Sequence, residues 1–297
     1  MSLNRPIWIL RKWINMEELD WIGLSQNPNA IQLLEKNPDK IDWYHLSMNP
    51  NAIELLEKNP DKINWFRLSL NPNAIHLLKA NLDKIDWINL SINPNAIELL
   101  EENMDKIEWD FLSANPNAIH LLEKNLDKIN WYILSSNPKS IKILENNIDR
   151  MDWRLISQNP NAIKILEENQ KKSNKINWDL LQLNSNGLNI IKKNFDKINW
   201  NMLSFNPSAI ELLEENWNKI NWNNLSKNIN GIELLERNQD KINWVRISAN
   251  PSIFELDYEA MRKNNEAIYE DLIKEVLHPS RVFKNPNYDY LEELFGD

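Results

Sequence analysis

Cysteine is absent from the chain, so disulfides, thiol catalysis and cysteine-ligated zinc are excluded. Glycine occurs only four times, and no apolar run approaches the roughly 18 residues needed to cross a membrane. The first residues, MSLNRPIWILRKW, are basic and aromatic, but their apolar stretch is too short and too interrupted for a secretory signal. We therefore expect neither a membrane span nor a disulfide framework.

An excess of positive charge is also lacking, since 43 Asp and Glu residues outnumber 34 Lys and Arg residues and the formal net charge is −9. This balance argues against a phosphate-binding track, and we expect no nucleic-acid partner. The 42% of hydrophobic residues is enough for a folded core. A chain of 297 residues would ordinarily indicate two domains, but an internal repeat overrides that expectation.

The repeat is seen most cleanly as IDWINLSINPNAIELLEENMDK, residues 85–106. Its tryptophans recur every 22 residues except for one interval of 25, and they mark eleven repeats, the last incomplete: Trp21, Trp43, Trp65, Trp87, Trp109, Trp131, Trp153, Trp178, Trp200, Trp222 and Trp244. The three extra residues, around Lys171–Ser173, are expected in a turn. A fixed period of this length is typical of a solenoid, in which each repeat buries its apolar face against its neighbours.

Each repeat is expected to contain a first short helix that starts at its tryptophan. Asp86 precedes Trp87 as an N-cap, and Trp87, Leu90 and Ser91 share one helix face. By this pattern the tryptophans belong to the core, although they could be imagined as a stacking platform for bases or sugars.

A second short helix follows each Asn-Pro step. Asn93 is expected to cap it and Pro94 to occupy its first turn, with an apolar face made by Ala96, Ile97, Leu99 and Leu100. Asn103 is expected to end it in the left-handed conformation. Both asparagine series are therefore interpreted as caps rather than as a binding site.

A leucine-rich repeat is the alternative, because its length and asparagine series are similar. If Leu46 and Asn49 are matched to that consensus, the positions of Tyr44 and Asn51 must be buried. In other repeats the position of Tyr44 is occupied by charged residues, such as Asp110 and Arg154. Charge in a solenoid core is costly, so the pattern favours helices.

The ends depart from the repeat. Residues 1–20 are expected to form a helical cap over the first repeat, or alternatively a membrane-surface helix. Residues 252–297 are interpreted as longer helices over 252–264 and 266–278 with a last short helix over 288–295, forming a second cap or a docking tail. Between them, 21–251 is the repeat array.

The pattern W-x-x-L-S-x-N-P-N-A-I-x-L-L-E-x-N-x-D-K-I resembles the short tandem-repeat proteins of amoeba-infecting giant DNA viruses of the mimivirus type. The segment from Ile268 through His278-Pro279-Ser280-Arg281 is similar to the ends of such proteins. The resemblance implies a repeat scaffold without enzymatic activity, located in the cytoplasm of an infected host cell or in the virion.

No residue set indicates catalysis, a metal or a cofactor. His76 and His120 occupy one solvated position two repeats apart, while His45 and His278 are scattered. Carboxylate pairs such as Asp83 and Asp86 recur at the turns, where capping explains the second member. We therefore expect a protein that is not an enzyme.

The positions that face away from the core are better candidates for binding. Two places after tryptophan, five successive repeats carry apolar residues, and the position five places after is often apolar too. We call the resulting nine residues the apolar stripe: Phe111, Ile133, Leu155, Leu180, Met202, Leu70, Ile92, Leu183 and Phe205. The stripe is flanked by His45, Arg67 and Arg246. It is either a binding groove or filler between tightly curved helices.

The sequence thus predicts an all-α protein: an elongated α-solenoid, or superhelix, of eleven helical-hairpin repeats with helical end caps. We expect a non-enzymatic scaffold that binds a protein partner, of the host or a second copy, through its concave face. The alternative is a structural protein that self-assembles into a homo-oligomer or a virion component.

Overall fold

The computed structural model describes residues 6–169 and 175–276. The chain divides into two compact units, one of residues 12–253 and one of residues 1–11 with 254–297. We call them the repeat body and the terminal body. The repeat body is mostly helical, with regularly repeating pairs of short α-helices about every 22 residues. The extra residues Lys171–Ser173 lie outside the described ranges.

The first helices all begin at the repeat tryptophan: α1 (Trp21–Gln26), α3 (Trp43–Leu46), α5 (Trp65–Leu68), α7 (Trp87–Ile92), α9 (Trp109–Leu112), α11 (Trp131–Leu134), α13 (Trp153–Ile156), α15 (Trp178–Leu181), α17 (Trp200–Leu203), α19 (Trp222–Leu225) and α21 (Trp244–Ile247). The predicted N-cap is confirmed, because an Asp86 carboxylate oxygen accepts from the Asn89 N–H at 2.8 Å. The residue three places after tryptophan, such as Leu90, is fully buried. Helices therefore stand where a leucine-rich repeat would need strands.

The second helices begin later than predicted: α2 (Ile31–Glu35), α4 (Ile53–Glu57), α6 (Ile75–Lys79), α8 (Ile97–Glu101), α10 (Ile119–Lys124), α12 (Ile141–Glu145), α14 (Ile163–Asn169), α16 (Leu188–Lys193), α18 (Ile210–Glu215) and α20 (Ile232–Glu236). Asn93 does not cap α8 directly. Its side-chain oxygen accepts from the Asn95 N–H at 3.0 Å, so it closes the turn that leads into the helix.

The asparagine after the second helix was expected in the left-handed conformation, and that expectation is wrong. Asn103 has φ −135° and ψ 52°. Its side-chain amide donates to the Leu99 carbonyl at 2.8 Å and so satisfies a carbonyl at the helix end.

Short 3₁₀ helices then connect the repeats: η2 (Pro38–Lys40), η3 (Pro60–Lys62), η4 (Leu82–Lys84), η5 (Met104–Lys106), η6 (Leu126–Lys128), η7 (Ile148–Arg150), η9 (Phe195–Lys197), η11 (Trp217–Lys219) and η12 (Gln239–Lys241). Among the described residues, three further 3₁₀ turns lie outside this series: η1 (Met16–Glu18), η10 (Pro207–Ala209) and η13 (Pro251–Ile253).

The tryptophans are half-buried rather than core, which corrects the prediction from the helix pattern. Six rings are covered by a cation from the end of the same repeat, as where Lys128 Nζ lies 4.5 Å from the centre of the Trp109 ring. The fully buried core instead consists of small and branched residues such as Leu112, Ala118 and Leu122. An indole ring suits this boundary between core and solvent, because its apolar body packs against the core while its face attracts a cation and its N–H can meet water.

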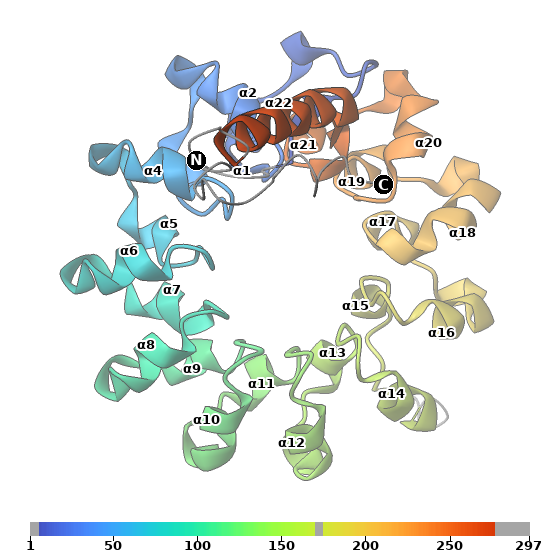
Figure 1. Ribbon diagram of the computed structural model, residues 1–297. Helices are drawn as coiled ribbons and strands as arrows, with labels where there is room; N and C mark the ends of the chain where they lie inside the picture. The colour runs from blue at the N-terminus through green and yellow to red at the C-terminus, as the bar shows by residue number, and fades with distance from the viewer. Residues whose placement is uncertain (1–5, 170–174, 277–297) are drawn as a thin grey trace, which may run out of the picture. The chain divides into compact units, whose positions relative to one another are not determined.

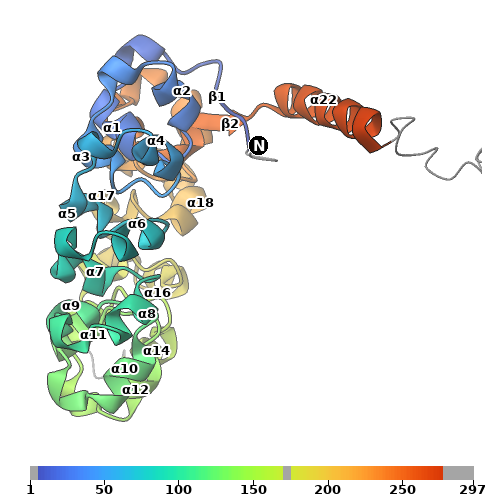
Figure 2. The same cartoon turned by 60° about the vertical axis from the view of Figure 1, so that its left-hand side comes forward.

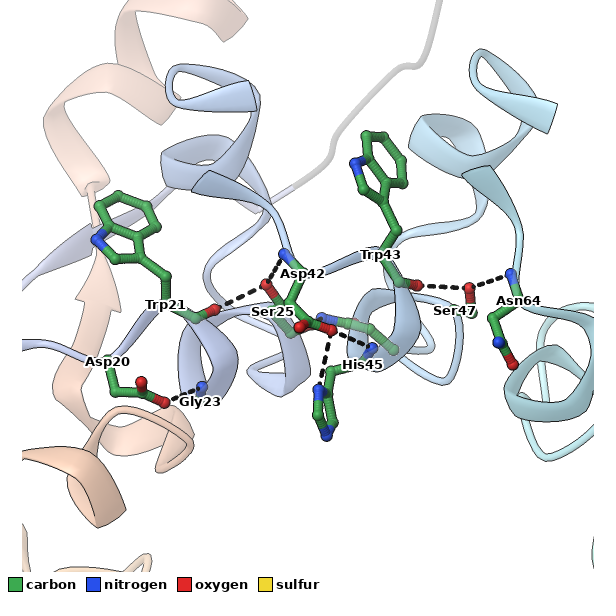
Figure 3. Close-up of polar contacts among 10 residues, drawn as sticks. Asp20, Trp21, Gly23, Ser25, Asp42, Trp43, His45, Ser47 and Asn64 are labelled. Atoms are coloured by element: carbon green, nitrogen blue, oxygen red, sulfur yellow. Dashed lines mark hydrogen bonds and ion pairs between the residues drawn. The ribbon is translucent and has the colours of Figure 1, made fainter. Parts of the chain in front are cut away.

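Neighbouring repeats are joined through serine (Figure 3). The Ser25 hydroxyl donates to the Trp21 carbonyl at 2.8 Å and accepts from the Asp42 N–H at 3.0 Å. Ser47 does the same between Trp43 and Asn64. The hydroxyl thus links the end of one first helix to the cap of the next.

Buried asparagines form a second link between repeats. The Asn49 amide donates two hydrogen bonds of 3.0 Å, to the carbonyls of Ser25 and Asn27 in the preceding repeat. The same pair of bonds recurs along the array, as at Asn115 and Asn206. The asparagine series therefore holds repeats together as well as closing turns.

The last repeat is bonded to the first by the same links. The Asn27 amide donates to the carbonyls of Ser248 and Asn250 at 3.0 Å, and the Asp20 N–H donates to the Ser248 hydroxyl at 2.8 Å. Helices α1 and α21 are in contact, and Figure 1 shows the helix pairs of the repeat body arranged around a ring. We call this junction the seam. The array was expected to be elongated and capped, but among the described residues its first repeat is covered by its last.

Gly23 lies at the seam, two places after Trp21. A Cβ there would lie 2.8 Å from Ser248 Cβ and 3.1 Å from the Ala249 nitrogen. The other repeats carry larger residues at this position, among them Phe111 and Met202. The close approach of the last repeat accounts for glycine in the first.

The terminal body contains β1 (Trp8–Leu10) and β2 (Phe254–Leu256), which pair antiparallel with Ile9 opposite Glu255. The expected N-terminal helix is therefore a strand followed by the turn η1. A single helix, α22 (Tyr258–Val276), replaces the two predicted over 252–278. It extends away from the strands in Figure 2. The short helix expected over 288–295 lies outside the described residues.

Candidate interaction surface

The first helices lie along the inside of the ring and the second helices along the outside (Figure 1). The apolar stripe is therefore carried by inner helices, with Phe111 on α9, Ile133 on α11 and Leu155 on α13. Leu180 and Met202 continue it on α15 and α17. These helices belong to successive repeats that are bonded to one another, so the structure brings the five side chains into one series.

All nine stripe residues retain solvent exposure. Phe111 is 37% exposed, and the other eight are half-buried. Four of them stand five places after tryptophan, at or just beyond the end of a first helix: Leu70, Ile92, Leu183 and Phe205. The stripe is thus partly covered by the repeats themselves and partly open.

The sequence interpretation missed a more exposed position, one place after tryptophan. Five consecutive repeats across the seam carry an apolar or aromatic residue there, and these side chains are between 41 and 65% exposed: Val245, Ile22, Tyr44, Phe66 and Ile88. The signal was present in the helical pattern, since this position lies about 100° from tryptophan, away from the core. That the last and first repeats are neighbours could not be deduced from it.

The outer edge carries a second exposed apolar series, at the start of the connecting 3₁₀ helices. Its members are 41 to 54% exposed: Leu82, Met104, Leu126, Ile148, Phe195 and Trp217. Phe195 and Trp217 contact the next tryptophan edge to face, with ring centres 5.6 Å and 5.0 Å apart.

The second helices present charge pairs between neighbouring repeats. Lys79 Nζ lies 2.6 Å from a Glu98 carboxylate oxygen. This hydrogen bond lowers the pKa of Glu98 below its usual value and raises that of Lys79. His76 and His120, expected to be solvated, each contact a glutamate of the preceding repeat, Glu57 at 2.8 Å and Glu101 at 2.9 Å.

Within residues 6–169 and 175–276, no group of three or more histidine, aspartate or glutamate side chains could hold a metal ion. Over the same part of the chain, no helix combines the length and apolar character that a membrane span requires.

One repeat departs from the serine link. Gln182 replaces the linking serine directly after α15, and its amide nitrogen donates to the Trp178 carbonyl at 3.0 Å. Its side-chain oxygen is buried without a partner. This repeat follows the 25-residue interval, where the sequence pattern is also least regular.

Comparison with known protein families, curated proteins and solved structures found no match. The function is therefore argued from the surfaces alone.

Proposed function

We propose that the chain is a non-enzymatic scaffold, an α-solenoid of eleven repeats closed into a ring, that binds a protein partner through its inner, concave face. The observation that carries this proposal is the half-open apolar stripe on consecutive inner helices. Exposed apolar area is unfavourable by about 25 cal/mol per Å² relative to burial, so a partner that covers the stripe gains free energy. Repeat proteins commonly bind through such concave surfaces.

The test is the double variant Phe111→Ser, Leu155→Ser. Both side chains retain exposure, so we expect the variant to fold and to lose capture of the partner from a host-cell lysate. Glu123→Ser, Glu145→Ser on the outer helices α10 and α12 is the matched control. A loss of several kcal/mol in the free energy of unfolding would instead identify the two residues as interior filler, and the binding function would fall.

Self-assembly is the second candidate, and the outer apolar series favours it. Those side chains are exposed on connecting turns in six repeats, where a second copy could cover them. Light scattering over a concentration series distinguishes the two functions, because a partner-binding scaffold stays monomeric. Leu126→Ser, Ile148→Ser would then dissociate the oligomer.

The resemblance of the repeat pattern supports a proposal for the source and location of the protein. We propose a repeat protein of the giant-virus type that acts in the infected host cell or is carried in the virion. Mass spectrometry of purified virions and of infected cytoplasm tests this placement.

A further inference from the structure

The five exposed residues across the seam define a second surface on the inner helices, distinct from the apolar stripe. It consists of Val245, Ile22, Tyr44, Phe66 and Ile88, carried by α21, α1, α3, α5 and α7, and we call it the seam arc. In the other repeats the same position holds mostly polar residues, such as Asp110, Arg154 and Asp179. Five consecutive apolar residues here are therefore a local feature rather than a property of the repeat.

Two arginines flank the seam arc without a carboxylate partner in the described part of the chain. The Arg67 guanidinium lies 4.4 Å from the centre of the Tyr44 ring, and its Nε is buried without a hydrogen-bond partner. Arg246 donates to the Asn224 side-chain oxygen at 3.0 Å, which is a neutral acceptor. Both guanidinium groups can therefore bind an added carboxylate.

Within residues 6–169 and 175–276, no carboxylate supplies that partner. None of the positions one, two or five places after tryptophan in these five repeats is Asp or Glu. The nearest acids in the sequence serve as caps, where Asp20 accepts from the Gly23 N–H, Asp42 from the His45 N–H and Asp86 from the Asn89 N–H. The seam arc is thus apolar and is flanked by two guanidinium groups that contact no carboxylate of the described residues.

We propose that the seam arc binds an acidic amphipathic peptide segment of another protein, with its apolar face on Tyr44 and Phe66 and a carboxylate on Arg67. Neighbouring helices are about 8–10 Å apart, so five of them span about 35 Å. A peptide helix of about 20 residues covers about 30 Å and matches this length. The helices that carry the arc line the inside of the ring (Figure 1), and this location favours a slender peptide over a flat lipid surface.

This proposal names the partner class for the inner face and so rests on the proposed function. Its test is a phage-display selection of peptides of about 20 residues on the immobilised full-length protein. The enriched sequences should combine leucine or aromatic residues with Asp and Glu. Their affinity, measured by fluorescence anisotropy, should fall at least about tenfold on Tyr44→Ser, Phe66→Ser, as at a binding hot spot.

Three single variants refine the result. Tyr132→Ser is the matched control, because Tyr132 stands at the same position on α11, outside the arc, and is 49% exposed. It should leave binding unchanged. Arg67→Gln should lower the affinity of the protein for acidic peptides. Arg67→Lys keeps the positive charge and should therefore retain part of that affinity.

Other outcomes overturn the proposal. Enriched peptides that lack acidic residues, or that bind Tyr44→Ser, Phe66→Ser as tightly as the parent, contradict it. Peptides lost only on Phe111→Ser, Leu155→Ser would leave the proposed function standing and refute the seam arc. A selection with no enriched sequence counts against both. Sedimentation with phosphatidylserine vesicles that depends on Tyr44 and Phe66 would identify a lipid surface instead.

Discussion

The side-chain amide of Asn27 donates a 3.0 Å hydrogen bond to the carbonyl of Asn250, which is 223 residues further along the chain. Asn49 makes the equivalent bond to Asn27, only 22 residues away. The junction between the last repeat and the first is therefore built like every other junction. Each repeat in the ring is supported on both sides, which for a linear array would hold only for inner repeats.

Asn27→Ala tests this closure. The substitution leaves the Ser248 and Asn250 carbonyls unsatisfied, which costs about 1–3 kcal/mol for a buried polar group. Asn115→Ala removes the same two bonds to Ser91 and Asn93 in the middle of the array. We expect equal losses in the free energy of unfolding in urea. A much smaller loss for Asn27→Ala would mean that the seam is open in solution.

Local features of the repeat could be predicted from the sequence because they depend on neighbouring residues. The cap at Asp86 and the buried position of Leu90 are examples. Ring closure depends instead on small rotations summed over all the repeats, and no single residue encodes that sum. Gly23 is a local sign of ring closure in the sequence. It could be interpreted only once the structure placed Ser248 next to it.

The candidate site shows the same division. The helical pattern identified Phe111 and Leu155 as facing away from the core, and both retain exposure. It placed the tryptophans in the core because Trp109 and Leu112 share a face, yet a helix of one turn leaves its first residue at the edge. The seam arc could not be assembled without the ring, since Val245 and Ile22 stand at opposite ends of the array.

Trp109 and Lys128 should be energetically coupled, because the ammonium lies over the indole ring. Trp109→Ala should cost about 2 kcal/mol, less than the 3–5 kcal/mol of a fully buried aromatic residue. A double-mutant cycle with Lys128→Ala should give a coupling of about 0.5–1 kcal/mol. The control is a second double-mutant cycle, between Trp109→Ala and Lys124→Ala. Lys124 is the last residue of α10, and this cycle should show no coupling. If the losses in the free energy of unfolding for Trp109→Ala and Lys128→Ala are additive, the contact between the ammonium and the indole ring is contradicted.

Lys79→Ala should raise the pKa of Glu98 towards its usual value. In the folded protein the Lys79 hydrogen bond lowers that pKa, so this contribution to stability is present above the unfolded pKa and is lost as the pH falls through the folded pKa. Carboxylate titration by nuclear magnetic resonance measures the shift. Both groups are exposed, so added salt should reduce it. Lys142→Ala, elsewhere on the outer surface, should leave the pKa of Glu98 unchanged. If both substitutions raise that pKa equally, Lys79 and Glu98 do not form a specific pair.

Gly23→Leu should open the ring. Leucine is compatible with this position of the repeat, because Leu155 and Leu180 occupy it in α13 and α15. At Gly23 even the Cβ would lie 2.8 Å from Ser248 Cβ, so the larger side chain can be placed only if the last repeat moves away. We expect a larger radius of gyration in small-angle X-ray scattering and a loss of about 1–3 kcal/mol, as for overpacking. Met202→Leu makes a matched change on α17 and should alter neither quantity. If Gly23→Leu keeps the parent's radius and stability, the first and last repeats do not meet as the structure shows.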